Sequence, residues 1–441
     1  MDKSGPRRAP SSHDKAPRMT APLHRTPPYA LTAPPAPDTP ALQGDIRTDI
    51  LIVGGGFTGL IAARELARRG AQVVVVEAGA LGTGGSGLNH GQCIPVFGYL
   101  DPSVIPQKGC ELLREAGRLV FDDIARDDIA CEAVQKGTLS AAHSPKGVAR
   151  ARAVHAKYAA LGKAGDWLSR EEVAALTGND RFLGGWVHRD GGHLNPLAYL
   201  RGLARAALAA GAAVHTESPA LTLTREGEHW RVNTPQGSIL AATVGFATNA
   251  YPTGAVPAPF ARSAVILTSY GLASRPLTAR QRAMVMPSGM NFGDTRRDPM
   301  FFRIDRQGRI ITGGLVEPRR GRDSALTARL LTRRLADLYP VLEGLQWDHH
   351  WSGRLAVSVE KRPQLYDLGP GLWGLSGYTG RGVPTSVVLG RVLAAALIDR
   401  AEAEALWTIR KPAAIPFRQV IGAAVQVFRG PWNKLRDRLG S

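Results

Sequence analysis

The stretch from Ile50 to Glu77 constrains the fold more than any other part of the chain. An apolar run at 50–53 is typical of a buried parallel strand, and it leads directly into glycines at positions 54, 56 and 59. In such a Gly-x-Gly-x-x-Gly turn the first glycine allows the tight turn and the second lets a pyrophosphate approach the backbone. The third lets helix and strand pack closely. The pattern predicts a strand, a phosphate-binding turn and a helix, in that order.

The residues after the glycines complete a dinucleotide-binding unit. Leu60, Ala63 and Leu66 share one face of the expected helix, which ends at Gly70, and 72–76 has the pattern of a second buried strand. Glu77 follows that strand, where a carboxylate can accept from both ribose hydroxyls and disfavours a 2′-phosphate. The unit therefore predicts FAD or NAD rather than NADP.

Length and composition set broad limits. With 441 residues the chain is long enough for two packed domains. It has no apolar window long enough to span a membrane and no apolar core of a secretory signal near its start, so we expect a cytoplasmic protein. Its three cysteines lack metal-ligand spacing and suggest reduced thiols. The net charge of +18 has three open explanations: the composition of the source proteome, attraction to membrane or nucleic acid, or a funnel for acidic substrates.

Two further glycine clusters lie far along the chain from the first. Residues 81–92 combine several glycines with polar side chains, which lets the backbone come close to a large ligand. Residues 374–384 form a glycine-rich turn before the apolar helix expected at 385–399, whose N-terminus would face an electron-rich group. We predict that all three bends meet around one elongated dinucleotide.

The remaining segments alternate between helical and strand patterns. Residues 1–43 are rich in proline and predict a disordered tail or a strap over the surface. Ser169 and Glu172 form a capping box for a helix that ends at Gly178. Residues 407–439 are basic and predict an amphipathic helix that docks on the protein itself or on a membrane surface. The other expected helices are 107–128, 146–161, 197–210 and 326–338, and the other expected strands are 133–142, 213–217, 220–224, 230–234, 238–246, 262–270, 284–286, 300–304, 309–312, 347–358 and 371–375.

The order of these motifs resembles the D-amino-acid-oxidase-like superfamily of FAD-dependent oxidoreductases, from about Asp45 to the C-terminus. Within it the chain is similar to the γ-glutamylputrescine oxidoreductase-like amine and amino-acid oxidases. The matching pieces are the two motifs at 54–59 and 77, and the stretches 85–92, 192–196, 247–251, 301–304 with 313–314, and 377–382.

The resemblance implies an α/β (α+β) fold with a Rossmann-like FAD-binding domain of the glutathione-reductase type and an antiparallel-sheet substrate domain. The expected FAD-binding domain comprises 44–105, 185–260 and 345–405. The expected substrate domain comprises 106–184 and 261–344, and 406–441 forms the basic C-terminal segment.

The resemblance also implies which residues surround the cofactor. They come from the glycine bends and from strands beside them: Gly54, Gly56, Phe57, Thr58, Gly59, Glu77, Ala78, Ser86, Asn89, His90, Gly91, Gln92, Val214, Gly353, Gly377, Gly380, Arg381, Gly382 and Val383. FAD is expected to be non-covalent, because the cysteine that carries flavin in some relatives is replaced near Gly353–Arg354 by Leu355–Ala356. A histidyl link through His90 is the alternative.

Substrate-side residues follow less directly. Arg303 lies in an otherwise apolar strand, where it is either a clamp for an acidic group or a structural ion-pair partner. Tyr251 and Tyr378, with Tyr270, either wall a slot for a cationic amine or belong to the core. His349 and His350 are adjacent on a strand and so face opposite ways, which argues against a metal site.

Departures from the family narrow the substrate. Relatives that oxidise N-methyl amino acids hold the carboxylate with basic residues, where this chain has Ile94, Phe97 and Pro384. An amine whose carboxylate is distant or absent is therefore favoured.

The resemblance implies hydride transfer from the carbon beside an amine nitrogen to flavin N5, hydrolysis of the imine, and reoxidation by dioxygen or another acceptor. Two alternatives remain: a tRNA-modifying flavoprotein of the same superfamily, suggested by the charge although nucleic acid is the less favoured partner, and a non-catalytic flavin-binding structural protein.

Overall fold

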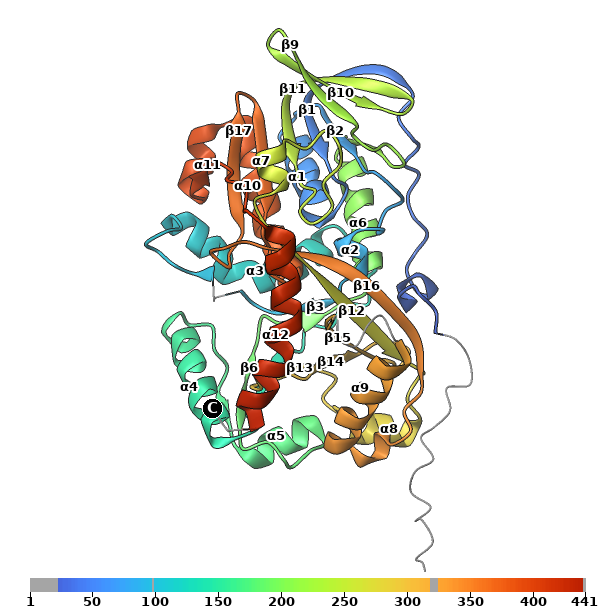
Figure 1. The fold of residues 1–441 in the computed structure, drawn as a ribbon, viewed down its shortest axis with the longest axis vertical. Helices are drawn as coiled ribbons and strands as arrows, with labels where there is room; N and C mark the ends of the chain where they lie inside the picture. The colour runs from blue at the N-terminus through green and yellow to red at the C-terminus, as the bar shows by residue number, and fades with distance from the viewer. Residues whose placement is uncertain (1–22, 97–98, 318–323, 439–441) are drawn as a thin grey trace, which may run out of the picture.

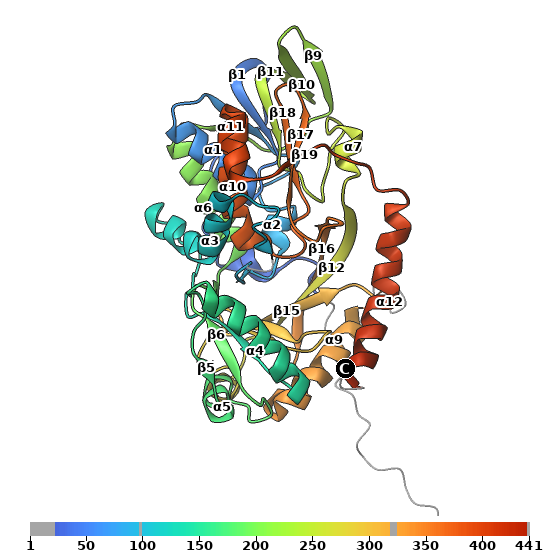
Figure 2. The same ribbon diagram turned by 90° about the vertical axis from the view of Figure 1, so that its left-hand side faces the viewer.

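The computed structural model describes residues 23–96, 99–317 and 324–438, and its strands form two large sheets (Figures 1 and 2). The first is a nine-stranded sheet with the order β19-β17-β18-β11-β1-β2-β8, extended by β10 and β9 beside β11. Its members are β1 Gly44–Val53, β2 Val73–Val76, β8 Ala213–His215, β9 Thr222–Glu226, β10 His229–Thr234, β11 Gly237–Phe246, β17 Gln364–Gly369, β18 Leu372–Ser376 and β19 Ile409–Arg410.

The centre of this sheet is parallel because helices connect its strands. β1 pairs in parallel with β2 and β11, and β2 pairs in parallel with β8. All four valines of β2 are buried, as expected of a strand covered on both faces. The helices that pack with the first sheet are α1 Phe57–Arg68, α2 Gly85–Leu88, α3 Gln107–Arg126, α6 Pro196–Ala209, α10 Gly382–Ile398 and α11 Arg400–Leu406.

α1, α3 and α10 are joined by a buried ion-pair network. The guanidinium of Arg64, which has no exposed surface, lies 2.6 Å from the carboxylate of Asp123 and also pairs with Asp127. Arg391 on α10 pairs with Asp123 from the other side at 2.9 Å. Because removal of one partner would leave a buried charge uncompensated, this network fixes how the three helices meet.

The second sheet has eight strands in the order β16-β12-β15-β14-β13-β4-β6-β5. They are β4 Thr138–Ala141, β5 Trp167–Leu168, β6 Gly185–His188, β12 Val265–Ser274, β13 Asn291–Asp294, β14 Phe301–Ile304, β15 Ile310–Leu315 and β16 Trp347–Val357. All neighbours are antiparallel except β13 and β4, which are parallel. A further pair of short strands, β3 Gln92–Cys93 and β7 Gly192–His193, is antiparallel.

α7 Ala258–Ala261 packs on the first sheet, where its Phe260 contacts Phe246 of β11 and Tyr366 of β17. The remaining helices lie on the second sheet or beside it: α4 Pro145–Ala160, α5 Arg170–Thr177, α8 Ala279–Met284, α9 Ser324–Leu338 and α12 Arg418–Arg438. The capping box of Ser169 and Glu172 is confirmed, and Gly178 ends α5 in the left-handed conformation. None of the helices in the described part of the chain is long and apolar enough to cross a bilayer.

Several predicted elements differ from those observed. Residues 284–286 were expected as a strand, but Met284 ends α8, which a capping box of Thr278 and Gln281 begins. The strand expected over 133–142 is reduced to β4, because Gly137 adopts a φ of +95° just before it. β6 and β16 fall in ranges assigned to the FAD-binding side, yet both are strands of the eight-stranded sheet, paired with β4 and β12.

The segment before β1 lies along the protein as a strap from residue 23 onwards, and its first part, 1–22, is outside the described residues. Tyr29, in the 3-10 helix η1 Pro28–Leu31, is 3% exposed, and Leu42 is 2% exposed. His24 forms a backbone bridge to His349 of β16. Of the two interpretations, these contacts favour the strap for 23–43.

Candidate cofactor and substrate site

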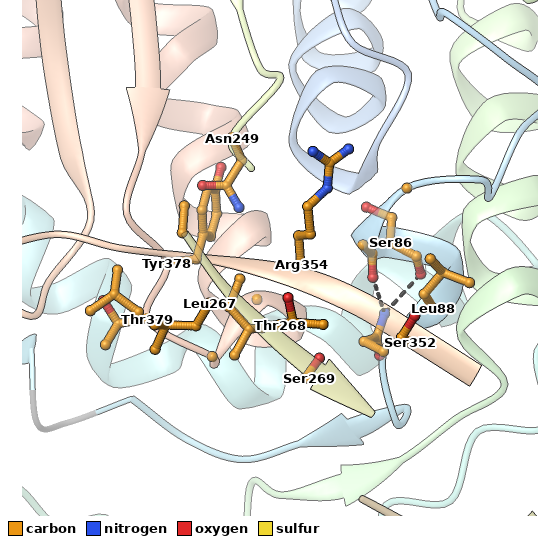
Figure 3. Close-up of a pocket in the computed structure, with 18 of the residues that line it drawn as sticks. Ser86, Leu88, Asn249, Leu267, Thr268, Ser269, Ser352, Arg354, Tyr378 and Thr379 are labelled. Atoms are coloured by element: carbon orange, nitrogen blue, oxygen red, sulfur yellow. Dashed lines mark hydrogen bonds between the residues drawn. The ribbon is translucent and has the colours of Figure 1, made fainter. Parts of the chain in front are cut away.

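One cavity of about 2150 Å³ lies between the two sheets, lined by residues of both. The three glycine-lined bends predicted to meet do so, since 54–58, 82–86 and 380–382 all line this cavity. Figure 3 shows the part where Leu267, Thr268 and Ser269 of β12 face Asn249 and Tyr378. The strands of the second sheet thus form a roof over the carboxyl ends of β1 and β2.

Each glycine of the first bend has a separate structural reason. Gly54 has a φ of +114°, which favours glycine. A Cβ on Gly59 would lie 2.0 Å from the carbonyl oxygen of Gly54, so only glycine allows this close packing of helix on strand. A Cβ on Gly56 would lie 2.9 Å from the Oγ of Ser86, at the surface of the cavity. The observed geometry agrees with the tight turn expected at Gly54 and the close helix–strand packing expected at Gly59.

Glu77 is held at the end of β2 by the backbone of two neighbouring turns. Its carboxylate accepts from the N–H groups of Gly55 at 2.8 Å and Gly79 at 3.3 Å, and burial raises its pKa. Each carboxylate oxygen retains a second acceptor position, which a ribose hydroxyl could use. The Oγ of Ser86 accepts a hydrogen bond from the backbone N–H of Phe57 at 3.0 Å. This bond connects the second bend to the start of α1.

The third bend is tied to the first through Tyr378. The hydroxyls of Tyr378 and Thr58 lie 2.6 Å apart, and the Tyr99 hydroxyl donates to the Tyr378 carbonyl at 2.7 Å. Asn249 accepts from the N–H of Gly377 at 3.2 Å, which adds the loop after β11 to the same assembly. These bonds bring the start of α10 to the cavity.

The open space beside the third bend and the polar groups of the lining suit a bound dinucleotide. A Cβ on Gly380 or Gly382 would meet no atom within 4 Å, so this bend borders open space at the start of the 17-residue helix α10. The buried Oγ1 of Thr248 belongs to a residue that lines the cavity, and it has no hydrogen-bond partner in the described part of the chain. The N–H groups that begin α1 and α10 and the acceptors of Glu77 are the donor and acceptor set that FAD requires.

His90 and Arg303 form a supporting pair under the second bend. Arg303 is 2% exposed and its Nε donates to the His90 carbonyl at 2.6 Å. The Nε2 of His90 lies 3.1 Å from the Tyr270 carbonyl, and burial lowers the pKa of this imidazole to about 4. Arg303 does not line the cavity. Its geometry therefore favours the structural interpretation over that of a substrate clamp.

Most of the predicted site residues line the cavity, and six do not. Those that line it are Gly54, Gly56, Phe57, Thr58, Glu77, Ala78, Ser86, Asn89, His90, Gln92, Tyr251, Tyr378, Gly380, Arg381, Gly382 and Val383. The six others are Gly59, Gly91, Val214, Arg303, Gly353 and Gly377. Gly59 and Gly377 act through packing and backbone bonds, whereas Val214 is buried in β8. Ile94 lines the cavity, Pro384 does not, and Phe97 lies outside the described residues.

The structure adds residues that the sequence did not single out. The hydroxyl of Tyr29 in the strap donates to the Asn89 carbonyl at 2.7 Å and so supports the second bend. Trp351 lines the cavity and its Nε1 donates to the Leu88 carbonyl at 2.8 Å. Alternation along β16 was the only available signal for Trp351, and nothing in the local pattern of the strap indicated Tyr29.

His349 and His350 face opposite ways, as alternation predicts. The Nδ1 of His349 lies 2.9 Å from the Thr26 carbonyl of the strap. His350 lines the cavity, and its buried Nδ1 has no hydrogen-bond partner among the described residues. Burial lowers the pKa of His350, so its imidazole is neutral near pH 7. Within the described residues, no group of three or more His, Cys, Asp or Glu side chains is placed to hold a metal ion.

Known proteins with similar sequences and folds agree with this geometry. The chain is 28% identical over 421 residues to gamma-glutamylputrescine oxidoreductase of Escherichia coli. The alignment covers 93% of this chain and 98% of that protein. It is 27% identical over 425 residues to a probable oxidoreductase OrdL of Rhizobium meliloti, with 93% and 97% covered. The crystal structure of glycine oxidase from Bacillus cereus matches with a TM-score of 0.68 and 19% identity, over 82% of this chain and 99% of that one.

The family model described as FAD dependent oxidoreductase, DAO, matches residues 49–396, which span both sheets and all three glycine bends. With its dinucleotide cradle built as FAD requires, the chain belongs to the DAO family of FAD-dependent oxidoreductases.

Proposed function

We propose that this protein oxidises the C–N bond of an amine or N-substituted amino acid whose carboxylate is distant from the reacting carbon or absent. The observation that carries the proposal is the cluster of aromatic side chains in the wall of the cavity opposite the glycine bends. It consists of Tyr270, Phe301, His350 and Trp351, from β12, β14 and β16. The name of one relative, gamma-glutamylputrescine oxidoreductase, supports this class of substrate.

Bound FAD would supply a hydride acceptor at N5. The chain's own contribution is to hold the substrate and to keep its nitrogen unprotonated. The rings of Tyr270 and His350, with centroids 6.2 Å apart, line the cavity side by side, and an aliphatic amine bound against them would be desolvated. Desolvation disfavours the ammonium form.

His350 is the group we assign to the amine proton. Its Nδ1 is buried, lines the cavity and has no partner among the described residues. A neutral imidazole in that position can accept the proton that an alkylammonium ion loses on entry. His90 is a weaker candidate because its Nε2 is engaged by the Tyr270 carbonyl.

The position of Ile94 supports the choice of substrate. It lines the cavity where related enzymes for N-methyl amino acids are expected to place a cation. A carboxylate beside the reacting carbon would find no counter-ion in the side chain of Ile94. Small amino acids are therefore expected to be poor substrates.

The test is an anaerobic screen for loss of the oxidised-flavin absorbance of the purified protein. Aliphatic and γ-glutamylated amines should reduce the flavin, and sarcosine and glycine should do so slowly or not at all. Rapid reduction of the flavin by sarcosine would show that the missing cation at Ile94 does not exclude small amino acids. If no amine reduces the flavin, the proposal is wrong, and the alternative of a non-catalytic flavin-binding structural protein is favoured.

The role of His350 has a separate readout. His350→Gln should move the pH dependence of flavin reduction upward, because only the fraction of amine already unprotonated in solution would then react. Unchanged pH dependence in this variant would remove His350 from the mechanism and leave the substrate class untouched.

A further inference from the structure

α12 presents two different faces along its length. One face is docked on the protein through polar contacts. The amide of Gln426 donates to the carbonyls of Thr268 and Val316 at 3.1 and 2.9 Å and accepts from the Thr268 N–H at 3.4 Å. Asn433, seven residues on, donates to the Arg297 carbonyl at 3.0 Å. A Cβ on Gly422 would lie 2.8 Å from the carbonyl oxygen of Ile266, so the backbone itself is in contact here.

The other side of this segment is apolar and largely exposed. This side includes Phe417, Ile421, Phe428 and Trp432. The last three are spaced by seven and four residues, which places them on one side of the helix, and Phe417, with a φ of +52°, immediately precedes it. The four side chains are 82%, 41%, 64% and 59% exposed, and Val420 beside them is 66% exposed. Of the twelve exposed large hydrophobic side chains in the described chain, five lie in this short stretch.

This arrangement is the reverse of the usual one. An amphipathic helix normally buries its apolar stripe against its own protein and exposes its polar side. Here the polar and glycine positions face the protein, whereas Phe417, Val420 and Trp432 are exposed. Figure 2 shows α12 at the outer edge of the molecule, along its long axis, with one side open. A contiguous exposed apolar patch of this kind marks an interaction surface.

The charge of the helix indicates what the surface meets. The sequence of α12 contains the basic residues Arg418, Arg429, Lys434, Arg436 and Arg438 and the single acidic residue Asp437. The whole chain carries a net charge of +18. A stretch rich in basic residues that also exposes aromatic and aliphatic side chains has the composition of an interfacial helix on anionic lipid.

We propose that α12 docks the protein on the surface of an anionic bilayer, with Phe417, Val420 and Trp432 entering the boundary between headgroups and acyl chains. Ile421, Val425 and Asn433 of the same helix line the cavity. Docking therefore brings the rim of the cavity close to the lipid surface. The proposal does not depend on the substrate of the enzyme.

The experiment is co-sedimentation of the full-length, FAD-loaded protein with vesicles of phosphatidylcholine alone or mixed with phosphatidylglycerol. Binding is expected with the anionic vesicles only, and it should weaken as salt is raised. Phe417→Ser combined with Trp432→Ser should weaken apparent affinity at least about tenfold, because two apolar anchors are lost. Flavin content and amine-dependent reduction of this variant should be unchanged, which shows that it is folded.

Leu221→Ser is the matched control, because Leu221 is an exposed aliphatic residue, 45% exposed, beside β9 and away from α12 (Figure 1). It should bind vesicles as the unchanged protein does. The proposal is overturned if no anionic vesicle binds at low salt, or if the double variant and the unchanged protein bind equally. It is also overturned if sedimentation velocity shows a dimer that the double variant abolishes, since the patch would then be an interface between two copies.

Discussion

Replacing the third glycine of the first bend should weaken the fold rather than the cofactor site. In Gly59→Ala the new Cβ would lie 2.0 Å from the Gly54 carbonyl oxygen and 3.2 Å from Cγ2 of Ile52. The first atom is backbone, so α1 and β1 must move apart by about 1 Å. Overpacking of this kind costs about 1–3 kcal/mol. A gain of about 1 kcal/mol from alanine in a helix opposes it. Because the Gly54 carbonyl is part of the rigid backbone, we use the upper end of the overpacking cost, about 3 kcal/mol. The free energy of unfolding should therefore fall by about 2 kcal/mol in total.

The assay is urea unfolding of the apoprotein followed by circular dichroism, with Gly382→Ala as the matched control. A Cβ on Gly382 meets no atom within 4 Å, so that variant should unfold within about 0.5 kcal/mol of the unchanged protein. It should instead bind FAD more weakly, because the added carbon enters the cavity. An unchanged urea midpoint for Gly59→Ala would refute the close helix–strand packing. Full FAD affinity of Gly382→Ala would show that the start of α10 does not face the cofactor.

Three further outcomes are expected. Arg303→Met leaves the His90 carbonyl without its donor and should raise the Kd for FAD about tenfold, with KM for the amine unchanged at saturating FAD. Gln426→Ala removes three hydrogen bonds to Thr268 and Val316, so limited proteolysis should cleave near α12 faster than in the unchanged protein. Burial lowers the pKa of His90 to about 4 and of His188 and His193 to about 3, so the stability that they contribute is complete above pH 6.5 and is lost as pH falls toward 3–4. Urea midpoints measured from pH 7 to 4 should fall, and more gradually in His193→Gln.

Local patterns with a physical cause could be predicted well. The first bend, the acid after β2 and the capping box of α5 depend on residues near each other in sequence, and all three are present as expected. The same kind of signal existed for α8, since Thr278 and Gln281 form a capping box. The apolar character of residues 284–286 was given more weight than this capping box, and these residues were predicted to form a strand. In the structure Met286 is buried at a turn with a φ of +48°.

Strand partners were harder to predict than strands. β16 was recognised as a strand, but its partner is β12, about eighty residues earlier, and the antiparallel register between them extends from Val265 to Ser274. Hydrophobic alternation specifies which side of a strand is buried but not which strand lies beside it. The assignment of β6 and β16 to the wrong sheet follows from this limit.

The same limit decided how much of the site could be read from the sequence. An arginine in an apolar strand must have a partner, and the sequence of residues 301–304 therefore indicated that Arg303 is either a clamp or a structural residue. Its partner is a backbone carbonyl 213 positions away, at His90, which no side-chain pattern encodes. His350 shows the converse case. Its neighbour His349 is satisfied by the strap at Thr26, and only the fold shows that the second imidazole lies in the cavity with an unpaired nitrogen. Residues whose role depends on side-chain type were identified from the sequence, and residues whose role depends on a distant backbone atom required the structure.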